Sequence, residues 1–237
     1  TRTATPTNTA TRTPTPTMLV PATATPTPTP TKSLITTPIA IADLVATHIE
    51  VTQAIQDLEN SVRLVAGKRT FVRFHVRSQW SNAWGTAELT IQGSGGTKVL
   101  SPINTSGGSL LVRQKPDREQ LPHAFLFEIP KGFNSGSLSL TARVKTPNNV
   151  IDVSPANNQI LTSVSFESVP EFKVVIYRVA YTFDGELYVP PLSHVNMMIS
   201  WIKRGFPTAD IAYAVRSTYV GNMTREWDTE GFWRSTY

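Results

Sequence analysis

The chain has 237 residues, a formal net charge of +5 and no cysteine. Its length suits one large domain or two small ones, and its apolar content is sufficient for a hydrophobic core. The absence of cysteine excludes disulfide bonds and Cys-ligated zinc or iron–sulfur sites, so packing must provide the stability.

The positive charge of the chain does not indicate nucleic-acid binding. Three basic residues, Arg2, Arg12 and Lys32, precede the first acidic residue, Asp43. The remaining basic residues alternate with apolar ones, as on solvated strand faces, and form no dense patch. We therefore expect no nucleic-acid partner. We also expect no membrane insertion in this stretch, because no apolar run is long enough to span a bilayer.

Residues 1–42 are predicted to form a Thr/Pro-rich segment without a core. Most of it reads TATPTNTATRTPTPT and ATATPTPTPTKS. Proline removes backbone donors and favours extended polyproline II, and the segment lacks apolar surface to offset the entropy of ordering. An extracellular stalk, open to O-glycosylation, and a plain linker are both consistent with this composition. Because the chain begins inside this tract and ends at Tyr237 without a stop signal, we expect it to be a piece of a longer protein.

Residues 43–168 show the period-two alternation of strands that bury one face. In FVRFHVR, residues 71–77, the apolar side chains of Val72, Phe74 and Val76 point to one side. His75 lies on the other side with two arginines, and we place it at the protein surface.

Similar alternation recurs along the rest of residues 43–168. It is present in residues 87–92, 124–129 and 138–145, and a last run covers residues 160–166. Glycine- and asparagine-containing turns separate these runs. About seven short strands without a helical period predict a mainly β fold, an immunoglobulin-like sandwich.

The order of three motifs resembles the bacterial cell-adhesion-related (CARDB) type of sandwich. The motifs are FVRFHVR after an Ala66-Gly67 corner, SLTARVK, and the loop Ser154-Pro-Ala-Asn-Asn158 before the last strand. That type commonly carries an acidic, Asn-Asn-containing loop at this place. Here Ser154 and Pro155 stand where acids are often found, which argues against ion binding by the loop.

Residues 169–237 change period and predict a strand, a helix and a second strand. FKVVIYRVAY, from Phe172, is apolar on both faces, as in a strand buried inside an α/β sheet. Asp184-Gly185 is expected to turn the chain, and Ser193 is the candidate N-cap of a helix with apolar residues at helical spacing. The helix is expected to have Lys203 and Arg204 in its last turn and Gly205 at the C′ position just after it, and residues 211–220 are expected to return as a strand parallel to the first. The sandwich is thus followed by a partial β-α-β unit.

We assign no catalytic, cofactor-binding or metal-ligating residue in this chain. The four histidines, His48, His75, His123 and His194, are far apart, and no His-Glu-x-x-His pattern is present. Asp184 and Glu186 form a close carboxylate pair, which we interpret as part of a solvated loop.

Trp80 and Trp84 are the candidate interaction residues. They stand close together in SQWSNAWG, and two indoles on a loop provide a platform for stacking on a sugar or for contact with a protein. Packing over the end of the sandwich is the alternative, because aromatic side chains tend to be buried.

A second resemblance involves the order of motifs along the chain. IEVTQAIQ, the Gly67 corner, FVRFHVR, HAFLFEIP, the Asn-Asn loop, Tyr188-Val-Pro-Pro and a helix ending near Phe206-Pro207 follow one another. Together they resemble the region upstream of the catalytic part in secreted bacterial metzincin-like zinc metallopeptidases. The resemblance implies that residues 169–237 begin a zincin-like domain and that the full-length parent binds zinc. Since the His-Glu-x-x-His helix comes later in such proteins, no zinc ligand or catalytic glutamate is carried over.

The sequence therefore predicts the non-catalytic N-terminal portion of a secreted or surface-attached bacterial protein. In the first interpretation the parent is a zinc metallopeptidase precursor, and the sandwich is an accessory interaction module. In the alternative the chain is an extracellular adhesion or carbohydrate-binding module with Trp80 and Trp84 as its contact surface. The expected partners are a protein or a cell-surface polysaccharide.

Overall fold

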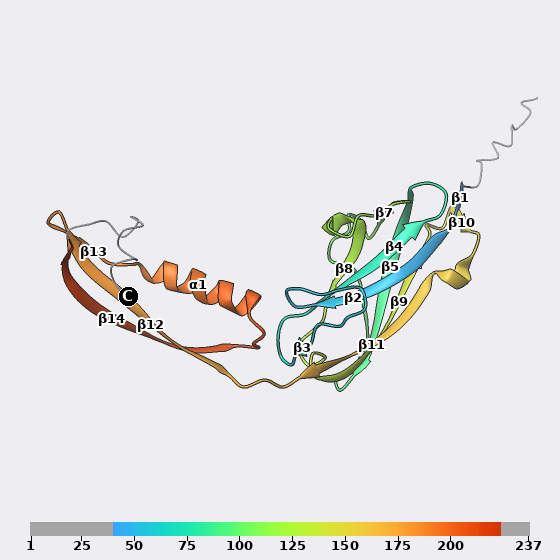
Figure 1. The fold of residues 1–237 in the computed structure, drawn as a ribbon. Coiled ribbons are helices and arrows are strands. Elements are labelled where there is room, and N and C mark those ends of the chain that lie inside the picture. The colour runs from blue at the N-terminus through green and yellow to red at the C-terminus, as the bar shows by residue number, and fades with distance from the viewer. Residues whose placement is uncertain (1–39, 224–237) are drawn as a thin grey trace, which may run out of the picture. The chain divides into compact units, whose positions relative to one another are not determined.

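The computed structural model of the protein describes residues 40–223 (Figure 1). Contacts divide the chain into two units, Thr1–Pro38 and Ile39–Tyr237. The segment predicted to be a stalk or linker lies outside the described residues, apart from Ala40–Ala42, which form strand β1. Strand structure therefore begins slightly earlier than residue 43.

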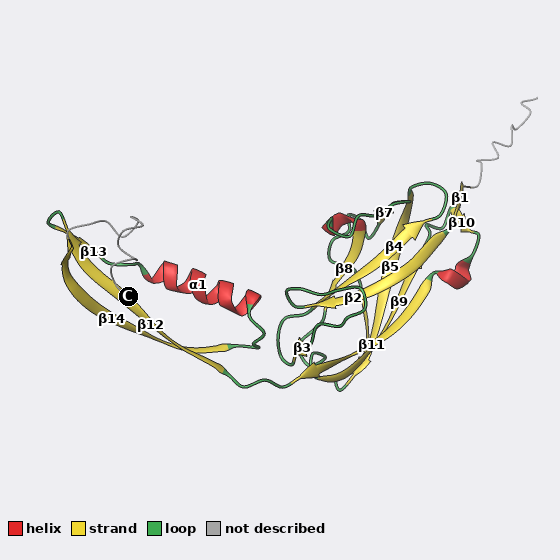
Figure 2. Ribbon diagram, viewed as in Figure 1, coloured by secondary structure: helices red, strands yellow, loops and turns green. Residues whose placement is uncertain are grey.

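Strands dominate the described residues (Figure 2). They are β1 (Ala40–Ala42), β2 (Leu44–Thr52), β3 (Leu64–Val65), β4 (Phe71–Ser78), β5 (Ala83–Gly93), β6 (Gly96–Leu100), β7 (Leu110–Val112), β8 (Ala124–Glu128), β9 (Gly136–Lys145), β10 (Val150–Asp152), β11 (Gln159–Glu167), β12 (Phe172–Phe183), β13 (Glu186–Tyr188) and β14 (Ile211–Met223). The helices are α1 (Leu192–Gly205) and two 3-10 turns, η1 (Leu121–His123) and η2 (Pro155–Asn157).

Two sheets enclose the main hydrophobic core. One has the order β2-β4-β8, and the other has the order β3-β11-β9-β5-β6, with β7 paired to β5. Buried residues from both sheets form one cluster, so the two sheets pack as the layers of a sandwich. The prediction of a mainly β, sandwich-like fold is confirmed.

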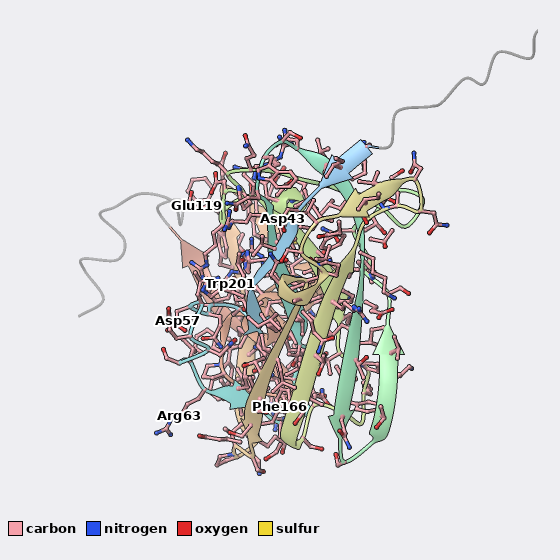
Figure 3. The ribbon with its side chains drawn as sticks, turned by 90° about the vertical axis from the view of Figure 1, so that its right-hand side faces the viewer. Asp43, Asp57, Arg63, Glu119, Phe166 and Trp201 are labelled. Carbon is pink, nitrogen blue, oxygen red and sulfur yellow. The ribbon has the colours of Figure 1, made fainter. Side chains whose placement is uncertain are left out.

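The alternation read from the sequence correctly separates the two faces of most strands. In β9 the residues Leu138, Leu140 and Val144 are fully buried, and their neighbours Ser139 and Arg143 are exposed. The hydrophobic side chains face the second sheet because successive residues of a strand point to opposite sides. Arg63, just before β3, does not face the second sheet and extends away from the ribbon into solvent (Figure 3).

The prediction that His75 lies at the surface is wrong. Its side chain belongs to the face of β4 opposite the core, but the residue is only 7% exposed. The reason is that charged side chains cover the strand at this point: the Glu50 carboxylate from β2 lies 2.9 Å from His75 Nε2, and Arg118 closes over the pair.

The Asn-Asn loop before β11 ties neighbouring strands together. Asn157 donates to the Asp43 carboxylate over 3.0 Å, and Asn158 donates to the Asp152 carboxylate over 3.0 Å. The backbone N–H of Leu44 donates to the same Asp152 side chain. These bonds connect the start of β2 with the β10–β11 connection, so both asparagines have a structural part in the sandwich.

Residues 172–223 contain a separate small sheet with the order β13-β12-β14, in which β12 and β14 are parallel. Helix α1 packs Val195 and Ile199 against Ile176 and Ile211. The predicted turn is present, with positive φ at Asp184 and Gly185. The interpretation of this segment as the start of a catalytic α/β domain stays a prediction.

Two details of this segment differ from the sequence analysis. The N-cap of α1 is Pro191, so Ser193 lies inside the first turn. Proline lacks an N–H that would need a cap partner and favours a helix start beside it, which explains the shift. Helix α1 also includes Gly205, and its C-cap is Phe206. Within the described residues β12 is covered on one face only, because Val175 and Tyr177 are largely exposed on the face opposite Ile176.

Leu140→Ala tests the assignment of the core. Leu140 is fully buried between the sheets, so truncation should lower the free energy of unfolding by about 2–5 kcal/mol through lost burial and cavity formation. Leu161→Ala is the matched control, since Leu161 is 67% exposed on the neighbouring strand, and it should change stability by less than about 0.5 kcal/mol. Urea unfolding measures both. Equal losses in the two variants would contradict the assigned faces.

Candidate functional site

Both candidate tryptophans are open to solvent. Trp80 is 52% exposed and Trp84 is 55% exposed. Trp84 projects outward because its neighbour Gly85 faces inward, where an added Cβ would come within 3.0 Å of Leu44 and 3.2 Å of Val112. Neither indole is covered by the end of the sandwich.

The backbone that carries the tryptophans is fixed by hydrogen bonds. Trp80 lies in the connection between β4 and β5, whereas Trp84 is the second residue of strand β5 and pairs with Leu111 of β7, so only one of the two indoles is on a loop. We call Gln79–Trp84 the tryptophan turn. The N–H of Gln79 donates to the backbone carbonyl of Asp43 over 2.9 Å, and the side chain of Asn82 accepts from the N–H of Gln114 over 3.1 Å. The Gln114 side chain in turn donates to the carbonyl of Trp80. The turn is therefore anchored at both its start and its centre.

A second candidate site is a groove of about 870 Å³ beside α1, which we call the helix groove. Sandwich residues around Lys68 line one side of the groove, and α1 with the residues that follow it lines the other. Its lining residues are Gln53, Ala54, Lys68, Arg69, Phe71, Asn196, Ile199, Ser200, Trp201, Lys203, Arg204, Gly205 and Ala209. Four of them are basic and none is acidic, so the groove favours an anionic ligand.

Lys68 joins the two sides of the helix groove. The residue is only 4% exposed, and its Nζ donates to the carbonyls of Lys203 (2.9 Å), Arg204 (3.2 Å) and Phe206. These carbonyls belong to the last turn of α1 and its C-cap, which lack intrahelical partners and carry partial negative charge. Burial lowers the pKa of Lys68 from its usual value, and the three acceptors offset part of that cost.

The corner that presents Lys68 depends on Gly67. Gly67 has a φ of +77°, which side chains with a Cβ rarely adopt. Its N–H donates to the carbonyl of Asn134 over 2.9 Å, and the Asn134 side chain donates to the carbonyl of Lys68 over 3.1 Å. The side chain of Lys68 therefore leaves the sandwich from a fixed backbone.

A buried charged cluster lies on β2 and β4. The carboxylate of Glu50 is within 2.9 Å of His75 Nε2, and it accepts from Arg118 Nη2 over 2.9 Å and from Arg73 Nη1 over 3.5 Å. Arg118 also donates to the backbone carbonyl of Gln56. Glu50 thus ties the segment that contains Arg118 to the sheet, which suits a structural role.

The surroundings of His75 favour its neutral form. Burial is the main cause that lowers the pKa of His75, and the positive charges of Arg73 and, when protonated, His48 act in the same direction. The hydrogen bond and the charge of Glu50 oppose this shift without cancelling it. Arg118 shares the Glu50 carboxylate and so competes with a protonated His75 for it.

The structure does not gather the histidines or the candidate carboxylates into a metal site. His48 and His194 are exposed on different elements, and His123 accepts a hydrogen bond at Nδ1 from the N–H of Asp117. Glu186 accepts from the hydroxyl of Tyr188 in the β12–β13 hairpin. Within residues 40–223, no three potential His, Asp or Glu ligands lie close enough to hold a metal ion.

Comparison of the chain with protein-family models, curated proteins and solved structures finds no match. Among the described residues, no helix is long and apolar enough to cross a membrane.

The sequence analysis identified the tryptophan turn and missed the helix groove. Trp201 falls outside the apolar spacing of the predicted helix, and an exposed aromatic residue on a helix is a signal that deserved a separate hypothesis. Lys68 directly follows the Ala66-Gly67 corner, and no local pattern marks it as a contact of the helix. Its contacts with α1 bridge 135 or more positions of sequence, which no local pattern encodes.

The first prediction from these sites concerns the pH dependence that the buried cluster around His75 gives to the stability. Because the pKa of His75 is lower in the folded than in the unfolded chain, the unfolded chain takes up a proton first as pH falls. The free energy of unfolding should therefore decrease as pH falls through about 6.5, the unfolded pKa of histidine. His75→Gln should reduce this decrease, and His194→Gln, at an exposed position, should leave it in place. Urea unfolding at about pH 7.5 and 5.5 measures the difference, and an unchanged slope in His75→Gln would refute the assignment.

The second prediction concerns Lys68. Lys68→Met keeps the length of the side chain but removes the three hydrogen bonds to the end of α1, so it should destabilise the helix terminus by about 1–3 kcal/mol. Amide hydrogen exchange should become faster in α1 and stay unchanged in β4. Lys131→Met, at an exposed position of a nearby loop, is the control. Unchanged exchange in Lys68→Met would show that Lys68 does not hold the helix.

Proposed function

We propose that the chain is a non-catalytic extracellular recognition module that binds carbohydrate through the tryptophan turn. The observation that carries this proposal is the exposure of two indoles, each more than half open, on the hydrogen-bonded β4–β5 connection and the start of β5. Indole faces stack on the apolar faces of sugar rings and bring large contact area with little rotamer entropy. Since the backbone of the turn is already held by Asp43 and Gln114, binding would not need to order it.

The test is affinity electrophoresis of the full chain in gels that contain soluble neutral polysaccharides, namely glucomannan, xyloglucan, mannan and dextran. At least one polymer should retard the protein, and Trp80→Ala and Trp84→Ala should each weaken binding by about tenfold. Tyr177→Ala, which removes an equally exposed ring from β12, should have no effect. Retardation by none of the polymers, or equal loss in all three variants, would overturn the proposal.

For the parent protein we propose a secreted or surface-attached zinc metallopeptidase precursor, with this chain as its accessory portion. The proposal rests on the sequence resemblance, and the order of β12, α1 and parallel β14 supports it, because such catalytic domains open with a strand, a helix and a second strand. Sequencing the gene beyond the codon of Tyr237 tests it. A His-Glu-x-x-His helix downstream is the expected result, and a further sandwich or a cell-wall anchor in its place would favour an adhesin.

A further inference from the structure

One exposed side of α1 carries polar and aromatic side chains that do not pack against the sheet. Asn196, Ser200 and Arg204 follow one another at a spacing of four residues, and Met197 and Trp201 form the adjacent row. Residues three or four apart lie on the same side of a helix. Because Val195 and Ile199 supply the contact with the sheet, the polar row is available to a ligand.

Trp201 is exposed, but its ring is held in place. It is 60% exposed, and its indole packs edge-on against Phe206 with the ring centroids 6.0 Å apart. Phe206 in turn stacks on Phe172 at 5.9 Å. The indole therefore offers a supported aromatic surface at the helix groove, opposite Phe71 of the sandwich.

Among the four basic residues of the helix groove, Arg204 is the one best placed to pair with a ligand. Arg69 forms a two-pronged ion pair with Glu128, and Lys203 pairs with Asp210 at 2.6 Å. Arg204 donates to the hydroxyl of Ser200 over 2.8 Å, and it has no ion pair within residues 40–223. Its guanidinium presents several donors in one plane, the geometry that suits a carboxylate.

The end of a helix normally repels anions because its carbonyls carry partial negative charge. In this structure the ammonium of Lys68 occupies three of those carbonyls. The groove also contains no acidic residue. An anion beside Arg204 therefore meets a positive field instead of the bare helix terminus.

We propose that the helix groove binds an acidic polysaccharide, a polymer of uronic acids. One sugar ring stacks on Trp201, its carboxylate pairs with Arg204, and its hydroxyls bond to Asn196 and Ser200. The groove has a volume of about 870 Å³, which is in the range of sites that hold ligands of a few rings. A supported ring surface together with amide and hydroxyl groups favours a charged sugar over an acidic peptide, which needs no stacking platform. The site is separate from the tryptophan turn and uses none of its residues.

The test is isothermal titration of the full chain with polygalacturonate, with dextran and poly-glutamate as comparison polymers. Polygalacturonate should bind, more weakly as salt rises from about 0.05 M to about 0.5 M, and dextran should not bind at this site. Trp201→Ala and Arg204→Gln should each weaken binding by about tenfold. Arg216→Gln and Tyr177→Ala are matched controls from the exposed face of β12 and β14 opposite Ile176, and they should bind like the unaltered protein.

Four results would overturn the proposal. Failure of polygalacturonate to bind shows that the groove is not a site for uronic acids. Equal weakening by Arg216→Gln shows attraction by overall charge, and equal or tighter binding of poly-glutamate shows an acidic peptide site. Circular dichroism of each variant separates lost binding from lost folding. Trp201→Ala and Arg204→Gln leave Trp80 and Trp84 unaltered, so binding of polygalacturonate that these two variants do not weaken would assign the polymer to the tryptophan turn and overturn the groove proposal alone.

Discussion

The apolar layer between the two sheets is the constraint on which the other features of the sandwich depend. In β4 the side chains of Val72, Phe74 and Val76 are almost completely buried, and Phe74 packs against Phe125 of β8 with ring centroids 6.2 Å apart. A shift of one residue in the register of β4 would turn Arg73 toward this layer and expose the phenylalanine. Such a shift would cost burial on every strand that pairs with β4, so the layer fixes both which residues pair and which face each residue occupies. The pairing of Glu50 with Arg73 across β2 and β4 is a direct consequence, because the register sets these two residues opposite each other.

That register also explains why the outer face of β4 is closed. Glu50 lies beside both Arg73 and His75, and a carboxylate that is almost fully buried must be paired to offset its desolvation. Arg118 supplies the further pairing and draws its own segment over the strand. The sheet is therefore covered on one face by apolar packing and on the other by a charged cluster. The cluster is more stable when His75 is neutral, because a protonated ring would add a second buried cation beside Arg73.

Period-two alternation predicted the strands, and it predicted their inner faces more reliably than their outer ones. The burial of inner positions such as Leu140 can be predicted from their apolar side chains alone, because the hydrophobic effect decides it. The burial of His75 and Lys68 could not be predicted in this way, since each depends on partners distant in sequence. His75 is covered by the pair of Glu50 and Arg118, which are 68 positions apart, and the carbonyls that hold Lys68 lie 135 or more positions away from it. The N-cap of α1 failed for a local reason, because Ser193 and Pro191 both signal a helix start and the proline prevailed. Of the candidate sites, the tryptophan turn was accessible to sequence reasoning, whereas the helix groove needs the fold to bring its two sides together.

The two candidate sites obtain their rigidity in different ways. The tryptophan turn is held through its backbone, by hydrogen bonds to Asp43 and Gln114, so its indoles are free to choose rotamers that suit a ligand. The helix groove is held through side chains, because Phe206 supports Trp201 and Lys68 binds the end of α1. A buried ammonium is costly, and the carbonyls at the end of α1 that surround Lys68 Nζ offset part of that cost. Since Gly67 sets the backbone that presents Lys68, the geometry of the groove depends on one glycine conformation and one charge in the sandwich as well as on the sequence of the helix.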